Sequence, residues 1–278
     1  MELVKGRSMN RIPRLALGLC YGLAGVLVLI SAAGLWLPEI YAKEKPSWAA
    51  QGMGQDAVDL FFVAPFLAFC AYQVGRWKRV FLFFLEGILG YLVYSFVLYA
   101  FCVHFNRIFF LYCAGLGLSV YALALLNLGV GPAEAGKWFD TRPSTKLPGL
   151  FFLAVTLIFY LLWLSEDIPA VLSGTGPKSL EEVGLFTNPV HILDLSLVLP
   201  AMLIASIQLL RHQTFGYWFF PVMMSFSIVM AVAIGGMVVA LKAKGITADL
   251  TVAYVFAGMI LADSFVLGFF LRSLRESR

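Results

Sequence analysis

Charged residues are scarce in this chain. They make up 13% of its 278 residues, whereas soluble globular proteins carry roughly 25%. Hydrophobic residues make up 61%, and the mean hydropathy is +0.87. A soluble globular domain is therefore excluded. The net charge of +4 does not indicate a nucleic-acid partner. The composition predicts an integral membrane protein with many spans, surrounded by the lipid bilayer.

Familiar catalytic motifs are also missing. The sequence contains no G-x-S-x-G, no H-E-x-x-H and no Walker A pattern. Its three histidines are too few for multi-haem ligation. The four cysteines form no C-x-x-C pair and lie within or beside apolar segments, so we expect buried free thiols. No named enzymatic activity follows from the sequence.

Long apolar segments dominate the chain. A membrane-spanning helix needs about 20 mostly apolar residues. The segments that meet this requirement cover residues 14–37, 57–75, 80–102, 108–129, 148–165, 192–210, 218–241 and 249–271. The sequence therefore predicts an all-α polytopic membrane protein with about eight transmembrane helices.

Basic residues gather at the N-terminus, at the C-terminus and in alternate loops. They are Lys5, Arg7, Arg11, Arg14, Arg76, Lys78, Arg79, Lys137, Arg142, Lys146, Arg211, Arg272, Arg275 and Arg278. The opposite set of loops is poorer in such residues. Because cytoplasmic loops carry an excess of Lys and Arg, we expect a protein of the cell membrane with both termini in the cytoplasm.

The chain also repeats itself with a constant offset of 135 residues. Residues 55–76 and 190–211 share six identical positions. The pairs are Asp59 and Asp194, Leu60 and Leu195, Val63 and Val198, Pro65 and Pro200, Gln73 and Gln208, and Arg76 and Arg211. We interpret them as a duplicated four-helix unit, with repeats at 1–135 and 136–278. Four spans per unit is an even number, so both copies would point the same way.

Two acidic clusters occupy corresponding positions in this repeat. Asp56 and Asp59 begin one span, and His191 and Asp194 begin its counterpart. Together they could bind an ion or solute or relay protons, with His191 titrating near neutrality. Asp59, His191 and Asp194 are also candidate ligands for a divalent metal ion. The alternative is structural: Asn188 or Asp56 caps a helix, and an aspartate in a first turn favours the helix dipole.

Two further acids lie deeper in their spans. Glu86 and Asp263 sit about one third of the way in from the predicted cytoplasmic side, where a helix-capping role is harder to assign. A charged side chain inside the bilayer costs at least about 2.5–3.5 kcal/mol. We therefore expect each to be protonated, or paired with Gln73, Gln208, Asn127 or an arginine. Tyr91, Tyr94 and Tyr99 in residues 80–102 are expected mainly to pack in the core.

The stretch Thr187–Leu195 reads TNPVHILDL and has a shorter counterpart in Gln55–Leu60, QDAVDL. On these two stretches the chain resembles an uncharacterised group of bacterial multi-pass membrane proteins. The resemblance implies a bacterial source and brings no activity with it.

Three functional hypotheses remain open. The first is a small transporter or permeation protein for a cation or a proton-coupled solute, with Asp56, Asp59, His191 and Asp194 as its outer site and Glu86 and Asp263 as its inner relay. The second is a membrane-embedded, metal-dependent enzyme that acts on lipid at the outer leaflet. The third is a non-catalytic subunit of a membrane complex, or a homo-oligomer.

Overall fold

A computed structural model describes residues 13–139 and 144–274. It contains eight helices that are long and apolar enough to cross a membrane. They are α1 (Arg14–Trp36), α2 with η2 and α3 (Pro46–Gly75), α4 (Val80–Cys102), α5 (Phe109–Gly129), α7 (Lys146–Ser173), α9 with η4 and α10 (Pro189–Leu210), α11 (Thr214–Ala243) and α12 (Leu250–Leu271). The protein is an all-α polytopic membrane protein, as the sequence predicts.

Two of the spans are built from three segments each. The second consists of α2 (Pro46–Val58), the π-helical segment η2 (Asp59–Val63) and α3 (Ala64–Gly75). The sixth consists of α9 (Pro189–Leu193), the π-helical segment η4 (Asp194–Val198) and α10 (Leu199–Leu210). The second span begins at Pro46, well before the expected start at residue 57, because its first turns are too polar to count as an apolar segment.

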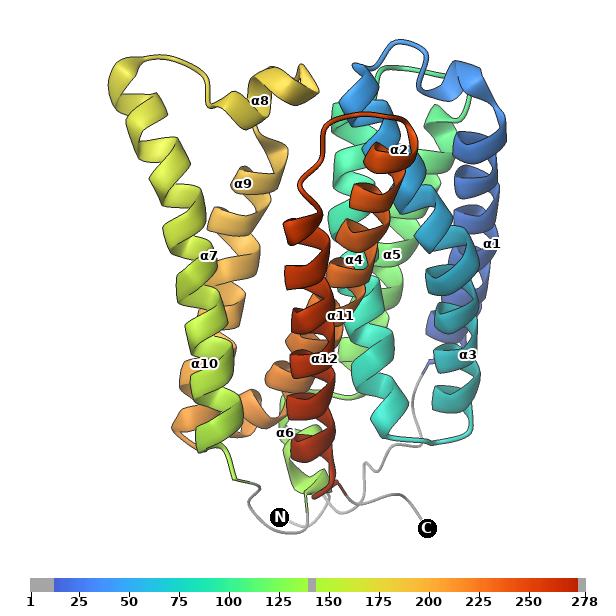
Figure 1. Cartoon of the computed structure of the whole chain (residues 1–278). Coiled ribbons are helices and arrows are strands. Elements are labelled where there is room, and N and C mark those ends of the chain that lie inside the picture. The colour runs from blue at the N-terminus through green and yellow to red at the C-terminus, as the bar shows by residue number, and fades with distance from the viewer. Residues whose placement is uncertain (1–12, 140–143, 275–278) are drawn as a thin grey trace.

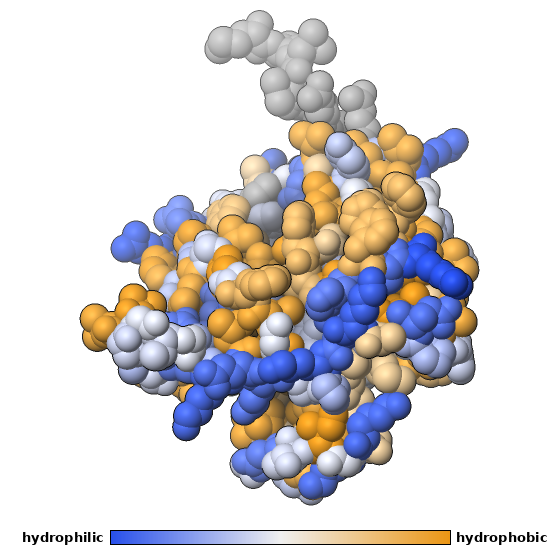
Figure 2. Space-filling model, turned by 90° about the horizontal axis from the view of Figure 1, so that it is seen from above, coloured by the Kyte–Doolittle hydropathy of each residue, from blue (hydrophilic) through white to orange (hydrophobic). Residues whose placement is uncertain are grey.

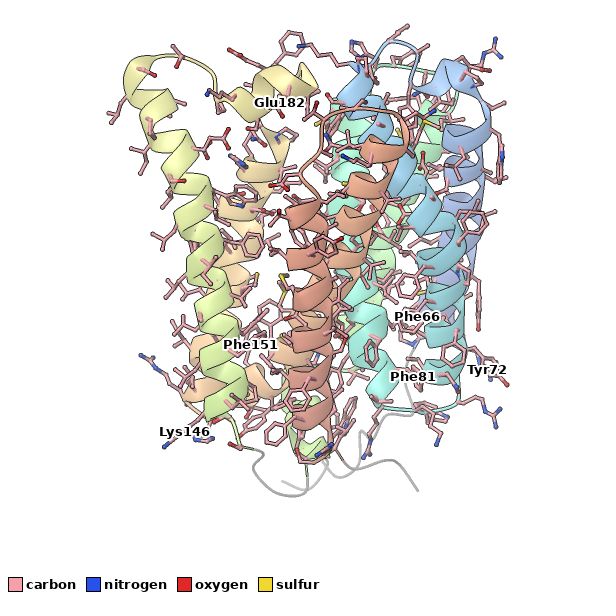
Figure 3. All side chains as sticks on the ribbon, viewed as in Figure 1. Phe66, Tyr72, Phe81, Lys146, Phe151 and Glu182 are labelled. Carbon is pink, nitrogen blue, oxygen red and sulfur yellow. The ribbon has the colours of Figure 1, made fainter. Side chains whose placement is uncertain are left out.

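The connections between spans are short and partly helical. They contain η1 (Pro38–Ile40), α6 (Pro132–Ala135), η3 (Gly136–Trp138) and α8 (Lys178–Val183). We call the end that carries α8 the upper end, as drawn in Figure 1. Glu182 lies at this end and Lys146 at the opposite, lower end (Figure 3). Viewed from above, hydrophilic residues cross the upper end, with hydrophobic residues around and between them (Figure 2).

The centre of the bundle is formed by α4 and α11, the two spans with the largest buried share. They pack closely because Gly87 lies against α11, where an added Cβ would be 2.5 Å from the Ser225 Cβ atom. The helix pair α2 and α11 comes equally close. There a Cβ on Gly54 would lie 2.6 Å from the backbone oxygen of Gly236. Small residues at helix crossings let backbones approach in this way, and these contacts join the two halves of the chain.

The two halves differ in how completely they close. In the first half α1 packs against both α3 and α5. In the second half α7 packs along α10 but meets α12 at few positions, so the pair α7 and α10 stands away from α12 (Figure 1). Large apolar side chains such as Leu161 on α7 and Leu261 on α12 are 70% and 73% exposed. Such side chains suit a surface in contact with lipid.

Candidate functional site

A π-helical segment starts at an aspartate in both composite spans. The N–H of Ala64 donates to the backbone oxygen of Asp59, and the N–H of Leu199 donates to that of Asp194. A proline follows as the second residue of the next α-helix in each span. Proline has no N–H for the regular ladder, and π-helical turns within α-helices occur frequently at functional sites. Pro65 and Pro200 are thus each preceded by a π-helical segment.

Asp56 and Asp59 belong to a buried group that we call the carboxylate–tyrosine group. The Tyr41 hydroxyl donates to Asp56 Oδ2 at 2.6 Å, and the Tyr99 hydroxyl donates to Asp56 Oδ1 at 2.8 Å. The Tyr91 hydroxyl donates to Asp59 Oδ1 at 2.8 Å. Both carboxylates are completely buried. Asp56 lies in the interior of α2, so the expectation that it caps a helix is wrong.

The loop between α1 and α2 completes this group. Tyr41 is buried, and the burial together with the neighbouring Asp56 carboxylate holds the pKa of Tyr41 well above its ordinary value. Gly34 on α1 leaves the space that Asp56 occupies, since a Cβ at Gly34 would lie 1.8 Å from Asp56 Oδ2. Tyr99 also stacks on Tyr112 of α5, with ring centroids 5.4 Å apart. Tyr41 of the loop and Tyr99 of α4 therefore hold Asp56, while Gly34 of α1 leaves room for it and Tyr112 of α5 packs against Tyr99.

His191 and Asp194 belong to a second group, which joins α7 to α9 and η4. We call it the Asp194 group. The Trp163 indole N–H donates to Asp194 Oδ2 at 2.9 Å, and His191 Nδ1 lies 2.8 Å from Asp167 Oδ1. The rings of Trp163 and His191 lie 4.2 Å apart. From α4, Tyr94 faces Asp194.

Helix capping accounts for one residue of this stretch. The Asn188 side chain accepts a hydrogen bond from the His191 N–H at 3.1 Å, with Pro189 in the first turn of α9. The structural alternative is therefore confirmed for Asn188. Asp194 lies beyond the first turn and accepts from a side chain of another helix, so capping does not account for it.

The four outer residues remain in two groups. Tyr91 and Tyr94 of α4 face Asp59 and Asp194 respectively, so α4 contributes to both groups. Within residues 13–139 and 144–274, no three His, Cys, Asp or Glu side chains gather as they would around a metal ion. The expected metal ligands Asp59, His191 and Asp194 therefore do not converge: Asp59 pairs with Tyr91, and His191 pairs with Asp167.

Glu86 and Asp263 are both fully buried, each with a partner on α11. The Trp218 indole N–H donates to Glu86 Oε2 at 2.9 Å. The Ser227 hydroxyl donates to Asp263 Oδ2 at 2.7 Å. The expected pairing with Gln73, Gln208, Asn127 or an arginine was wrong, because helix rotation turns both acids towards α11. In the described part of the chain, Glu86 Oε1 and Asp263 Oδ1 are buried without a hydrogen-bond partner.

A cavity of about 330 Å³ lies between the two halves. We call it the central cavity. Its walls come from α2, α4, α7, α9, η4, α10, α11 and α12, and most of them are apolar. Asp194 and Tyr94 lie on the wall. Gln55, which lies beside Asp59, and Ser227, which binds Asp263, also line it. The carboxylates of Asp194, Asp59 and Asp263 thus reach this cavity directly or through one polar side chain.

Several contributors to these groups escaped the sequence reasoning. Tyr41, Trp163 and Trp218 come from segments distant in the chain from the acids that they contact. The tyrosines of α4 carried a signal, because Tyr91 and Tyr99 are eight residues apart and so share one helix face. They were expected mainly to pack in the core, whereas each donates a hydrogen bond to a carboxylate.

No protein-family model matches the chain, and neither a curated protein nor a solved structure shows a match to it. The resemblance to a bacterial membrane-protein group therefore stays a prediction.

Proposed function

We propose that the protein is a proton-coupled transporter of the cell membrane, with its solute bound in the central cavity. The observation that carries the proposal is the position of Asp194, a carboxylate on the wall of a cavity inside the membrane-spanning bundle. Ionisable residues within spans are expensive and mark ion, proton or substrate pathways. An acid on a cavity wall can release a proton and bind a solute there, and neither the proton nor the solute has to cross lipid to reach it.

Two further acids extend the proposed proton pathway. Ser227 connects the cavity to Asp263, and Trp218 on the same helix holds Glu86 closer to the lower end. The carboxylate oxygens Glu86 Oε1 and Asp263 Oδ1 are buried without partners in the described residues. A buried oxygen of this kind is costly unless it is protonated or meets a transient donor. Both acids thus suit the role of an inner relay.

Transport also needs a movement, and the duplicated sequence supports one. In the proposed parallel repeats, α7 corresponds to α1, and α12 corresponds to α5. The counterpart pairs differ, because α1 packs on α5 whereas α7 stands away from α12. We propose that the α7–α10 pair rocks onto α12 until it resembles the closed first half. This movement would narrow the central cavity and alter access to Asp194.

Matched backbone features support treating the halves as repeats. The segments η2 and η4 begin 135 residues apart, as the sequence offset predicts. The same offset separates Trp77 and His212, which have positive φ values of 65° and 54° just after α3 and α10. The excess of basic residues at the lower end further supports a cytoplasmic location for that end. Asp194 would then be reached from the outer half of the bilayer.

Flux through proteoliposomes tests the proposal. The purified protein is reconstituted in vesicles that contain a pH-sensitive dye, and proton entry is followed under an imposed potassium diffusion potential and with candidate solutes. Asp194→Asn, Asp59→Asn and Glu86→Gln are compared with Asp249→Asn, which alters an exposed acid at the N-terminus of α12. We expect Asp194→Asn to abolish protein-dependent flux and Asp249→Asn to leave it unchanged. Unchanged flux in Asp194→Asn, Asp59→Asn and Glu86→Gln alike would refute the proposal.

A further inference from the structure

The central cavity has the walls of a site for an apolar molecule. Phe159 on α7, Phe226 on α11 and Phe256 on α12 contribute aromatic side chains, and four methionines from α10, α11 and α12 also line the cavity. Its volume of about 330 Å³ falls within the range of about 300–1,000 Å³ that is typical of ligand pockets. Methionine-rich walls adapt to ligands of different shape. The apolar walls do not suit a small hydrated ion.

The charge of the cavity is one-sided. Among the described residues that line it, Asp194 is an acid, and none is a lysine or an arginine. Tyr94 and Trp163 lie beside this carboxylate and present aromatic rings, which attract organic cations as well as apolar groups. A negatively charged headgroup would meet Asp194 without a compensating cation. The electrostatics therefore favour a positively charged ligand.

The upper end of the bundle is bridged above this cavity. Helix α8 lies between α7 and α2 in Figure 1. On the α7 side the Ser179 N–H donates to Glu166 Oε1 at 3.1 Å, and on the α2 side Lys45 Nζ donates to the Glu181 backbone oxygen at 2.6 Å. Ser47 donates to the backbone oxygen of Glu182 as well. These bonds tie α8 to both sides and restrict access from the aqueous phase above.

The side of the cavity between α7 and α12 is less restricted. Phe159 and Trp163 are one helical turn apart on α7, and Val252, Phe256 and Met259 form a matching stripe on α12. Val252 lines the cavity and is nevertheless 39% exposed. Since these two helices meet at few positions, an apolar molecule dissolved in the bilayer can reach the cavity laterally.

We infer that the central cavity binds a lipophilic organic cation, which reaches it from the membrane between α7 and α12 and places its positive charge against Asp194. The inference rests on the proposed function and names its substrate class. A carboxylate that holds either a proton or the organic cation, but not both, couples the two: binding of the cation releases a proton, and protonation releases the cation. The protein would thereby exchange lipophilic cations for protons.

Binding to protein in lipid nanodiscs tests the inference. The probes are radiolabelled tetraphenylphosphonium and, in separate samples, radiolabelled tetraphenylborate, an anion of nearly the same shape. Saturable binding above that of empty nanodiscs is expected for the cation. The affinity for the anion is expected to be at least tenfold weaker. Because a proton competes for the same carboxylate, the affinity for the cation should rise with pH, by up to about tenfold per unit.

Two variants separate the charge from the shape of the site. Asp194→Asn should weaken cation binding at least tenfold and remove its pH dependence, while Met259→Trp should fill the cavity and reduce binding at every pH. Asp249→Asn is the matched control and should bind like the unmodified protein. Each variant is first checked for a monodisperse elution profile. Equal affinity for the two probes, or undiminished binding in Asp194→Asn, would overturn the inference.

The outcomes also distinguish this inference from the proposed function. Asp194-dependent proton flux without saturable binding of the cation would overturn the substrate class and leave proton coupling in place. Saturable, Asp194-dependent binding without any proton flux would establish the site and refute transport.

Discussion

The substitution Gly34→Ala tests whether Asp56 is held as the structure shows. Its added Cβ would lie 1.8 Å from Asp56 Oδ2 and 2.7 Å from Asp56 Cγ, whereas ordinary contacts lie at 3.4–4 Å. The carboxylate would therefore have to shift by more than an ångström. Such a shift breaks the hydrogen bonds from Tyr41 and Tyr99, which measure 2.6 Å and 2.8 Å.

The cost follows from two effects. Overpacking a buried site costs about 1–3 kcal/mol, and leaving buried groups without their hydrogen bonds costs about 1–3 kcal/mol each. Part of the strain is relieved when the hydrogen bonds break, so we expect Gly34→Ala to lower the free energy of unfolding by about 3 kcal/mol. For a chain of this size that corresponds to a fall of about 6–12 °C in the unfolding midpoint.

The assay heats the detergent-solubilised protein and measures the temperature at which half of it no longer elutes as a monodisperse species. This temperature is the unfolding midpoint. Gly25→Ala is the control, because it lies on the same helix and an added Cβ there meets nothing within 4 Å. Its midpoint should stay unchanged or rise slightly, since alanine favours helix. The decisive comparison is Gly34→Ala in an Asp56→Ala background, where the clash is absent and the additional loss should fall below about 1 kcal/mol.

Two results would refute this reasoning. One is a midpoint for Gly34→Ala equal to that of Gly25→Ala, which would place Asp56 away from α1. The other is a loss that persists undiminished in the Asp56→Ala background, which would mean that Gly34 acts through another neighbour.

Three further predictions concern the residues around the carboxylates. Asn188→Ala removes the cap of α9 and should cost about 1 kcal/mol, seen as a lower thermal midpoint that Asn188→Asp restores. Trp218→Phe removes the N–H that donates to Glu86 and should lower the free energy of unfolding by about 1–3 kcal/mol. In a Glu86→Leu background this loss should largely vanish. Equal losses in both backgrounds would contradict the pairing. Burial raises the pKa of Tyr41. The contribution of Tyr41 to stability is therefore complete below the pKa of the unfolded state, about 10, and is lost as the pH rises above that value. Between pH 9 and about pH 11 the thermal midpoint of Tyr41→Phe should fall less than that of the unmodified protein.

The sequence by itself determined the class of structure. Apolar segments of about 20 residues have few alternatives to transmembrane helices, because every backbone polar group must be satisfied inside the lipid. Eight such helices are present in the part of the chain that the structure describes. The offset that pairs Asp59 with Asp194 also relates the two π-helical segments that the structure shows, since a proline six residues after an aspartate removes the same backbone donor in both spans.

Only the tertiary structure decided which side chains meet. Glu86 pairs with Trp218 and His191 pairs with Asp167 because helix packing brings together positions that are up to 132 residues apart. In apolar spans nearly every face is hydrophobic, so the pattern of residues does not reveal how a helix is rotated or which neighbour it contacts. The separation of α7 from α12, and with it the central cavity, likewise depends on packing between helices whose sequences look alike in hydropathy.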